Sequence, residues 1–163
     1  MDVLDLDRTR VLAAVAGPTL EGANLCFQEL PRADLARAFM AGALLDGADL
    51  RGADLSGADL SGTSLVGASL RRSRLRGAQL AGADLEAASL RDADLHAADL
   101  ENADLTGTNL EGADLENARL LGANLEAARL DRCRLAGALY DEFTQWPEGF
   151  DPAAAGARRS GPA

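Results

Sequence analysis

The chain has 163 residues, of which 47% are hydrophobic, and a formal net charge of -10; this length suffices for one domain with a core of ordinary size. Aromatic residues make up only 4%, and all 16 basic residues are arginine, so a core must be assembled from many small aliphatic contributions. The acidic balance excludes a general binder of nucleic acid or of anionic membranes, because both need a net basic surface.

The N-terminal segment, residues 1–17, predicts a short capping helix. Its sequence DRTRVLAAVAGP starts with Asp7, a suitable N-cap, and reaches Gly17, a common helix terminator. Pro18 follows directly and cannot continue a helix.

A targeting or membrane segment is not expected. The apolar stretch VLAAVAG, residues 11–17, is short and follows three aspartates, whereas a signal peptide begins with positive charge. No apolar run reaches the roughly 18 residues that span a bilayer. We therefore expect a cytoplasmic protein that does not contact membranes.

A period of five residues dominates the rest of the chain. From Leu20 to Tyr140, every fifth position is apolar and 23 of these 25 positions are Leu; two residues earlier, 19 of 24 positions are Ala. This period fits neither a helix nor an alternating strand. Short extended segments that turn a corner every five residues would point both positions inward, and Gly at 13 of the 24 positions two residues after the central one supplies the turn.

The repeated unit A(D/N)LxG, intact as ADLRG, ADLSG, ADLTG and ANLEG, resembles that of the pentapeptide repeat proteins over residues 18–137. The resemblance implies an all-β fold, a right-handed quadrilateral parallel β-helix with four pentapeptides in each coil. It also implies about six coils stacked at about 4.8 Å, the usual distance between strands.

The stretch from Phe27 to Leu45 is the least regular part of the repeat. Phe27 replaces a corner Gly, Gln28 takes a small inward slot and Phe39 precedes Met40. Two interpretations stay open at this stage: a bulge or loop interrupts the coil, or its slots accept larger side chains.

Arginines gather on one predicted face. In a four-sided coil, residues 20 apart stack, so the surface is a set of columns. This arrangement brings together a candidate patch for an anionic ligand or partner, made of Arg51, Arg71, Arg72, Arg74 and Arg91. Alternatively, these side chains pair with Asp54 and Asp94 and only keep the rod soluble.

Acidic residues follow one to two coils further on. A candidate acidic face comprises Asp94, Asp99, Asp104 and Asp114. Aspartates just before the central Leu also have a structural interpretation, because such side chains accept hydrogen bonds from nearby backbone amides at turns.

The repeat ends in an aromatic segment, residues 138–152, which contains Tyr140, Phe143, Trp146 and Phe150. Such rings suit a cap over the last coil, and the segment resembles a C-terminal segment of bacterial, often cyanobacterial, pentapeptide repeat proteins. Residues 153–163 are expected to form a flexible tail.

Catalytic, cofactor and metal sites are not expected. A filled rod lacks the concave site that positioned acid-base or nucleophilic groups need. His96, the only histidine, is predicted to point outward. The chain holds no CxxC motif, and Cys26 and Cys133 fall about five coils apart, too far for a disulfide.

The sequence leads to two hypotheses about function. The first is a non-enzymatic scaffold that binds an unidentified protein partner and no nucleic acid directly. The second rests on the resemblance: some pentapeptide repeat proteins are dimeric acidic rods that mimic DNA, bind DNA gyrase and protect it from quinolones. Those proteins carry Phe at many central positions where this chain has Leu, and the arginines of residues 71–76 interrupt an acidic track. The scaffold is compatible with a monomer, whereas the mimic requires an end-to-end homodimer.

Overall fold

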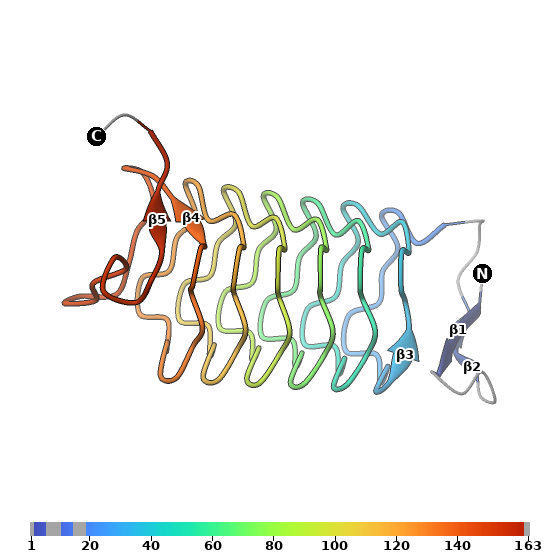
Figure 1. Cartoon of the computed structure of the whole chain (residues 1–163). Coiled ribbons are helices and arrows are strands. Elements are labelled where there is room, and N and C mark those ends of the chain that lie inside the picture. Colours follow the sequence, from blue (N-terminus) through green and yellow to red (C-terminus); the bar gives the residue numbers. More distant parts are fainter. Residues whose placement is uncertain (1, 6–10, 15–18, 162–163) are drawn as a thin grey trace.

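The computed structural model describes residues 2–5, 11–14 and 19–161, and these residues form a stack of coils with the chain termini at opposite ends (Figure 1). Isolated parallel bridges join residues that are 20 apart, such as Asp54 with Arg74 and Arg74 with Asp94. Four pentapeptides therefore complete one coil. No helix long and apolar enough to cross a membrane occurs in this part of the chain.

In a regular pentapeptide every backbone N–H group has an acceptor, either in a neighbouring coil or within the pentapeptide, as residues 54–58 illustrate. The N–H groups of Leu55 and Gly57 donate to the next coil at 2.7 and 2.9 Å, and that of Asp54 donates to the previous coil at 2.9 Å. The Ala58 N–H closes the turn on the Leu55 carbonyl at 3.0 Å. The remaining donor, the Ser56 N–H, bonds the Asp54 carboxylate at 3.0 Å. The side chain before the central Leu thus completes the hydrogen bonding of the turn.

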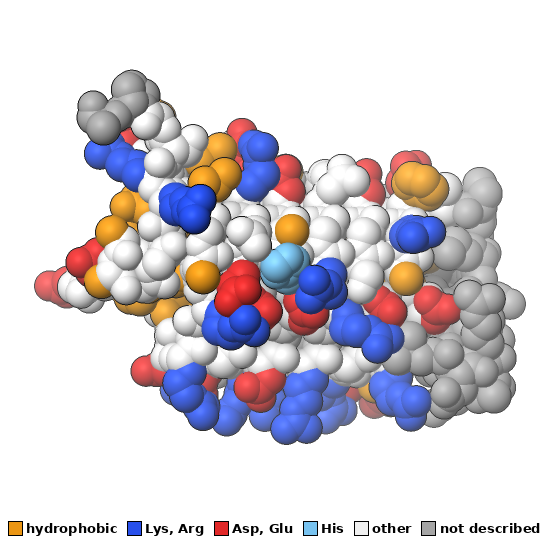
Figure 2. All heavy atoms as spheres, in the orientation of Figure 1, with side chains coloured by type: hydrophobic (Ala, Val, Ile, Leu, Met, Phe, Trp, Pro, Cys, Tyr) orange, Lys and Arg blue, Asp and Glu red, His pale blue; other side chains and the backbone are white. Residues whose placement is uncertain are grey.

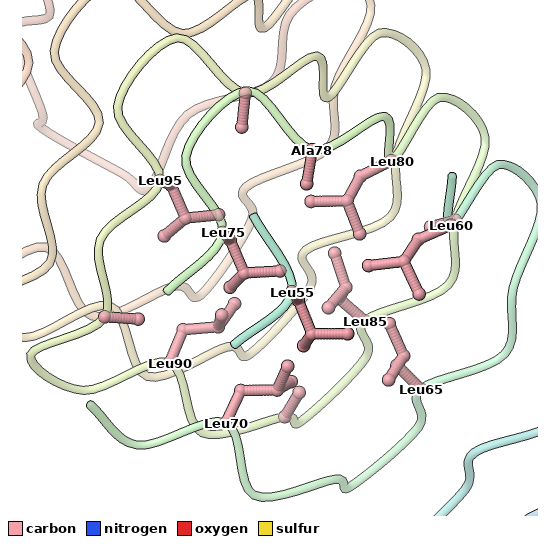
Figure 3. Packing of buried hydrophobic residues seen from close by; sticks show 14 of the residues in the cluster. Leu55, Leu60, Leu65, Leu70, Leu75, Ala78, Leu80, Leu85, Leu90 and Leu95 are labelled. Atoms are coloured by element: carbon pink, nitrogen blue, oxygen red, sulfur yellow. The ribbon is translucent and has the colours of Figure 1, made fainter. Parts of the chain in front are cut away.

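The interior is a column of leucines and alanines. Leu55, Leu75 and Leu95 stack along one side of the coils and Leu60 and Leu80 along another (Figure 3), and none of these side chains is more than 1% exposed. Three inward slots carry hydroxyl residues in place of Ala, and each hydroxyl donates to a backbone carbonyl: Thr63 to Leu60, Ser73 to Leu70 and Thr108 to Leu85. Because these polar groups are paired, the core tolerates them.

The corners require a left-handed backbone. The residue two after the central position has φ between 55° and 73° in every pentapeptide from Gly22 to Gly137, including eleven residues that are not glycine. An L side chain is disfavoured in this conformation, whereas glycine adopts it readily. The coil therefore imposes strain wherever the corner residue is Ala or Arg.

The irregular stretch from Phe27 to Leu45 keeps the coil path. Bridges join Glu29 to Asp49 and Phe39 to Asp59 in the same 20-residue register. Gln28 is exposed and Phe27 is 78% exposed. The larger side chains are accommodated by turning outward, and no loop interrupts the stack.

The predicted N-terminal helix is wrong where the structure describes it. Strands β1 (Asp2–Asp5) and β2 (Val11–Ala14) form an antiparallel pair, and β1 also pairs antiparallel with β3 (Ala33–Asp34), with Leu4 opposite Asp34. The rest of residues 1–17 lies outside the described residues. An open coil edge presents backbone donors and acceptors that a strand can pair with and a helix cannot, so the edge overrides local helical preference.

Aromatic side chains gather at the C-terminal end. Trp146 meets Tyr140 edge-on, with ring centroids 5.7 Å apart, and stacks on Phe150 at 5.3 Å. These three side chains are partly buried against the core, whereas Phe143 is 69% exposed.

Beyond the rings, the chain returns to the coils. Strand β5 (Arg158–Arg159) runs parallel to β4 (Leu139–Tyr140), and residues 152–156 form turns. The structure thus places ordered turns and a strand in the segment for which the sequence predicts a flexible tail.

The corner strain predicts opposite effects for two substitutions. Ala87→Gly relieves a φ of 55° and should stabilise the protein by about 0.5–1 kcal/mol, after the extra backbone entropy of Gly is subtracted. Gly62→Ala should destabilise it by about 1 kcal/mol, because a Cβ at Gly62 meets nothing within 4 Å and only the backbone conformation is affected. Urea unfolding midpoints measure both; the same sign for the two variants would contradict the corner argument.

The turn hydrogen bond predicts a second pair of effects. Asp104 accepts hydrogen bonds from the Thr106 N–H at 2.9 Å and the Thr106 hydroxyl at 2.5 Å, so Asp104→Ala should destabilise the protein by about 1–2 kcal/mol, since each such bond contributes about 1 kcal/mol. Asp104→Asn should have a smaller effect, because Asn109 already makes the same bond to the Glu111 N–H at 3.0 Å. Equal losses in urea unfolding of the two variants would assign the effect to the charge of Asp104 instead.

Candidate functional site

The arginine face is built by stacking. Arg51, Arg71 and Arg91 each follow a central Leu and lie in successive coils, since neighbouring coils pair with a shift of 20 residues. Arg72 occupies a corner with φ of 57°, and Arg74 lies in the bridge column. Figure 2 shows arginine side chains along the lower edge of the stack, with acidic side chains between them.

Arg51 is held by a local carboxylate. Its Nε donates to Asp49 Oδ1 at 2.8 Å and its Nη2 to Asp49 Oδ2 at 2.5 Å. This hydrogen-bonded pair is the main reason that the pKa of Asp49 is lowered, with burial opposing it. Arg51 therefore offers a fixed guanidinium whose charge is already partly neutralised.

Of the five predicted arginines, Arg71 and Arg72 have the weakest ion pairing. Arg72 comes no closer than 4.0 Å to Asp92 and its side chain is 83% exposed. Arg71 makes no ion pair or side-chain hydrogen bond among the residues that the structure describes. With Arg51 and Gly52 they line a shallow hollow of about 390 Å³, referred to below as the arginine hollow. Three of its four lining residues are arginines, and Gly52 contributes no side chain.

The other two predicted arginines are balanced by acids. Arg74 bonds Asp54 at 2.9 Å, and Arg91 lies 3.6 Å from Asp92 and 3.7 Å from Glu111. Asp94, the second acid beside Arg74 in the bridge column, bonds Arg76 at 3.2 Å. The structure thus brings Arg51, Arg71 and Arg72 to one hollow and leaves Arg74 and Arg91 flanking it in ion pairs.

The four candidate aspartates serve the turns. Asp94 and Asp114 share a bridge column, while Asp99 and Asp104 belong to the next two columns around the coil. Each accepts the backbone N–H two residues later, at 2.9–3.1 Å. Instead of forming one acidic face, they are distributed over three sides of the coil.

Stacking also creates a cluster that the sequence reading missed. One ligand atom each from His96, Asp114 and Glu116 lie within 4.8 Å of one another; the spacing of 20 between residues 96 and 116 was the available signal. Both carboxylates bond Arg134, Asp114 at 3.1 Å and Glu116 at 2.6 Å. The guanidinium of Arg134 therefore already supplies the positive charge at this cluster.

Cys133 is unsuited to nucleophilic chemistry. Burial, with a smaller contribution from the charge of Asp114, raises its pKa to about 12. The thiol therefore stays protonated near neutral pH, and a protonated thiol is a weak nucleophile.

The ion pairs predict how stability depends on pH. The pKa of Asp49 is lowered chiefly by Arg51; burial raises that of Asp54, but hydrogen bonds from Ser56 and the charge of Arg74 outweigh burial and lower it. Because both folded values lie below the unfolded value of about 3.9, the stabilisation is complete above that pH and is lost as pH falls through the folded values.

Thermal unfolding followed by circular dichroism should therefore give a constant Tm between about pH 6 and 8 and a falling Tm below about pH 4. In Asp49→Asn/Asp54→Asn the decline should be shallower. An identical acid slope in this variant and the wild type would show that other groups govern acid unfolding.

The comparisons agree with the coil geometry. The family described as "Pentapeptide repeats (8 copies)" matches residues 19–57, 40–72, 53–92, 68–107 and 108–138. A search of curated proteins found no match.

Solved structures of the same kind are similar to this chain. The pentapeptide repeat protein Rfr23 from the cyanobacterium Cyanothece 51142 is 39% identical over 57% of this chain and 63% of its own, with a TM-score of 0.57. The match thus spans less than two thirds of Rfr23. The pentapeptide repeat protein alr5209 from Nostoc is 35% identical over 75% of this chain and 84% of its own, with a TM-score of 0.50.

A pentapeptide repeat protein from the Arabidopsis thaliana thylakoid lumen is 31% identical over 61% of this chain and 66% of its own, with a TM-score of 0.50. Three observations point to the same family: the match to the repeat model, the parallel bridges between residues 20 apart and the leucine core. The chain belongs to the pentapeptide repeat family, whose fold is a right-handed β-helix.

Proposed function

We propose that this protein is a non-enzymatic binding scaffold that presents the arginine hollow to an acidic segment of a protein partner. The observation that carries the proposal is that Arg71 has no ion pair among the described residues and Arg72 only a long one, 4.0 Å from Asp92, next to Arg51, on a chain of net charge -10. A cationic hollow on an acidic rod repels general polyanions at long range and accepts a local carboxylate cluster at short range.

The chemistry of the hollow favours carboxylates. A guanidinium forms two parallel hydrogen bonds with a carboxylate, and Arg71 has no ion pair among the residues that the structure describes. Each exposed ion pair contributes about 0.2–1 kcal/mol, so three arginines together supply a modest and salt-sensitive affinity. Such affinity suits a reversible scaffold.

A role in catalysis lacks support from the residues that the structure describes. The core is filled by leucines that are almost entirely inaccessible. The thiol of Cys133 stays protonated. The proposal therefore assigns function to surfaces and none to a reactive centre.

The test is an affinity capture from the source organism's extract at low salt, followed by binding of the purified partner. The variant Arg51→Ser/Arg71→Ser/Arg72→Ser should weaken binding by about 10-fold or more, since two to three exposed ion pairs are lost. A matched control removes three arginines that are already paired: Arg119, Arg132 and Arg134, which bond Glu101, Glu111 and Glu116.

Equal weakening by the two triple variants would attribute binding to overall charge and contradict the proposal. DNA gyrase belongs in the same panel, as the alternative function inferred from the family resemblance. Gyrase that binds both triple variants as well as the wild type, with loss of supercoiling activity, would replace the scaffold with the DNA mimic.

A further inference from the structure

The last coil has a backbone edge that the chain does not use. One coil earlier, the N–H groups of Leu110, Gly112 and Leu115 donate to the carbonyls of Arg129, Asp131 and Arg134 at 2.9, 2.9 and 2.8 Å. The equivalent donors in the last coil belong to Leu130, Arg132 and Leu135. Within the described part of the chain these three donors have no acceptor, and the carbonyls of Ala128 and Cys133 have no donor.

The edge is open because the chain leaves the coil path after Gln145. Gln145 still pairs with the coil below, donating to Ala123 at 2.9 Å and accepting from Leu125 at 2.7 Å. The coil path resumes at Gly156, whose carbonyl accepts from the Gly137 N–H at 2.9 Å, and continues at Arg158, whose N–H donates to Ala138 at 2.7 Å. The turns between these points project beyond the last coil (Figure 1), so residues 128–135 are bypassed.

The core is also less covered at this edge. Leu130 and Cys133 occupy inward positions but are only partly buried, whereas Leu110 and Ala113, their counterparts one coil earlier, are 0% exposed. The side of the last coil that lacks backbone partners is thus the side where apolar surface remains accessible.

A groove of about 420 Å³ runs along this edge, lined by residues 128–131 and 147–150. Ala128, Leu130, Pro147 and Phe150 give it apolar walls. Its charged lining residues are Arg129, Asp131 and Glu148. Arg129 lies 3.7 Å from Glu111 and 3.9 Å from Asp131, whereas Glu148 has no ion pair among the described residues, so the acids outnumber the one cation. Apolar walls with acids that lack strong partners favour a chain segment that combines apolar and basic side chains.

We propose that this C-terminal groove binds an extended peptide segment of a partner protein that carries Lys or Arg, and that the segment adds a parallel strand to residues 128–131. The Leu130 N–H donates to a peptide carbonyl, and the Ala128 carbonyl accepts from a peptide N–H, as one coil pairs with the next. The basic side chain lies between Asp131 and Glu148. Addition of a strand to an exposed edge is a general mode of peptide recognition.

The protein itself shows that its coil edges accept strands, because β1 pairs with β3 at the opposite end. A second copy is a poorer occupant, since the projecting turns of both copies would lie between two facing ends (Figure 1). This inference does not depend on the arginine hollow, whose residues belong to earlier coils.

The test starts from a phage-displayed library of random octapeptides selected on the full chain. Selected peptides should contain Lys or Arg among apolar residues, and their synthetic versions should bind in fluorescence polarisation. Binding should weaken at least 10-fold in Asp131→Lys/Glu148→Lys and remain within two-fold in Glu29→Lys/Glu86→Lys, a control with the same charge change at exposed residues outside the groove. Leu130→Pro, which removes the central donor, should also lose binding.

Amide hydrogen exchange locates the contact. In the free protein the Leu130 and Arg132 amides should exchange faster than those of Leu110 and Gly112, and bound peptide should slow them. Failure to select basic peptides, or equal binding to Asp131→Lys/Glu148→Lys and wild type, would overturn the proposal even if Leu130→Pro failed to fold. A dimer in light scattering that protects the same amides without peptide would assign the edge to a second copy and also overturn it.

Discussion

The structure depends on backbone hydrogen bonds between residues in successive coils. A pentapeptide makes few contacts within itself: one turn bond and, where Asp or Asn is present, one side-chain bond to the turn. Its other donors require the coils above and below. Stability is therefore a property of neighbouring coils, as in other repeat proteins, and the two end coils are the places where this requirement must be met by something else. At the N-terminal end β1 meets it at Ala33–Asp34, while the C-terminal end leaves residues 128–135 unmatched.

The sequence predicts the coils well because one rule repeats without a break. The inward Leu and Ala positions, the turn role of Asp and the stacking columns all follow from the five-residue period and the family's four-sided coil. The ends do not repeat, and there the predictions weaken. The sequence predicts a helix over residues 11–14, but they form a strand, because β1 pairs with β2 and with the coil edge at Ala33–Asp34.

The candidate site was predicted only in part. The 20-residue spacing tells which residues lie next to each other in successive coils, but the side-chain conformations decide which of these residues form ion pairs. We expect Arg74 to pair with Asp54 and Asp94; in the structure it bonds Asp54, whereas Asp94 bonds Arg76. The open edge could not be foreseen, because it arises from a register change: Asn124 pairs with Gln145, 21 residues on, and Leu139 pairs with Arg158, 19 residues on. Neither shift leaves a pattern in the composition of the segment.

The 20-residue coil links the length of this protein to the pattern on its surface. Gain or loss of four pentapeptides leaves every later residue on its own side of the square. Gain or loss of one pentapeptide keeps the core intact, since each side uses the same Leu and Ala slots, yet it rotates all later columns by a quarter turn. Duplication of one pentapeptide between Arg51 and Arg71 would thus place Arg51 on a different side from Arg71 and Arg72 and keep the leucine pattern of the core. The surface of this chain can therefore change while the fold stays the same. The number of pentapeptides between two residues decides whether both lie on one binding face.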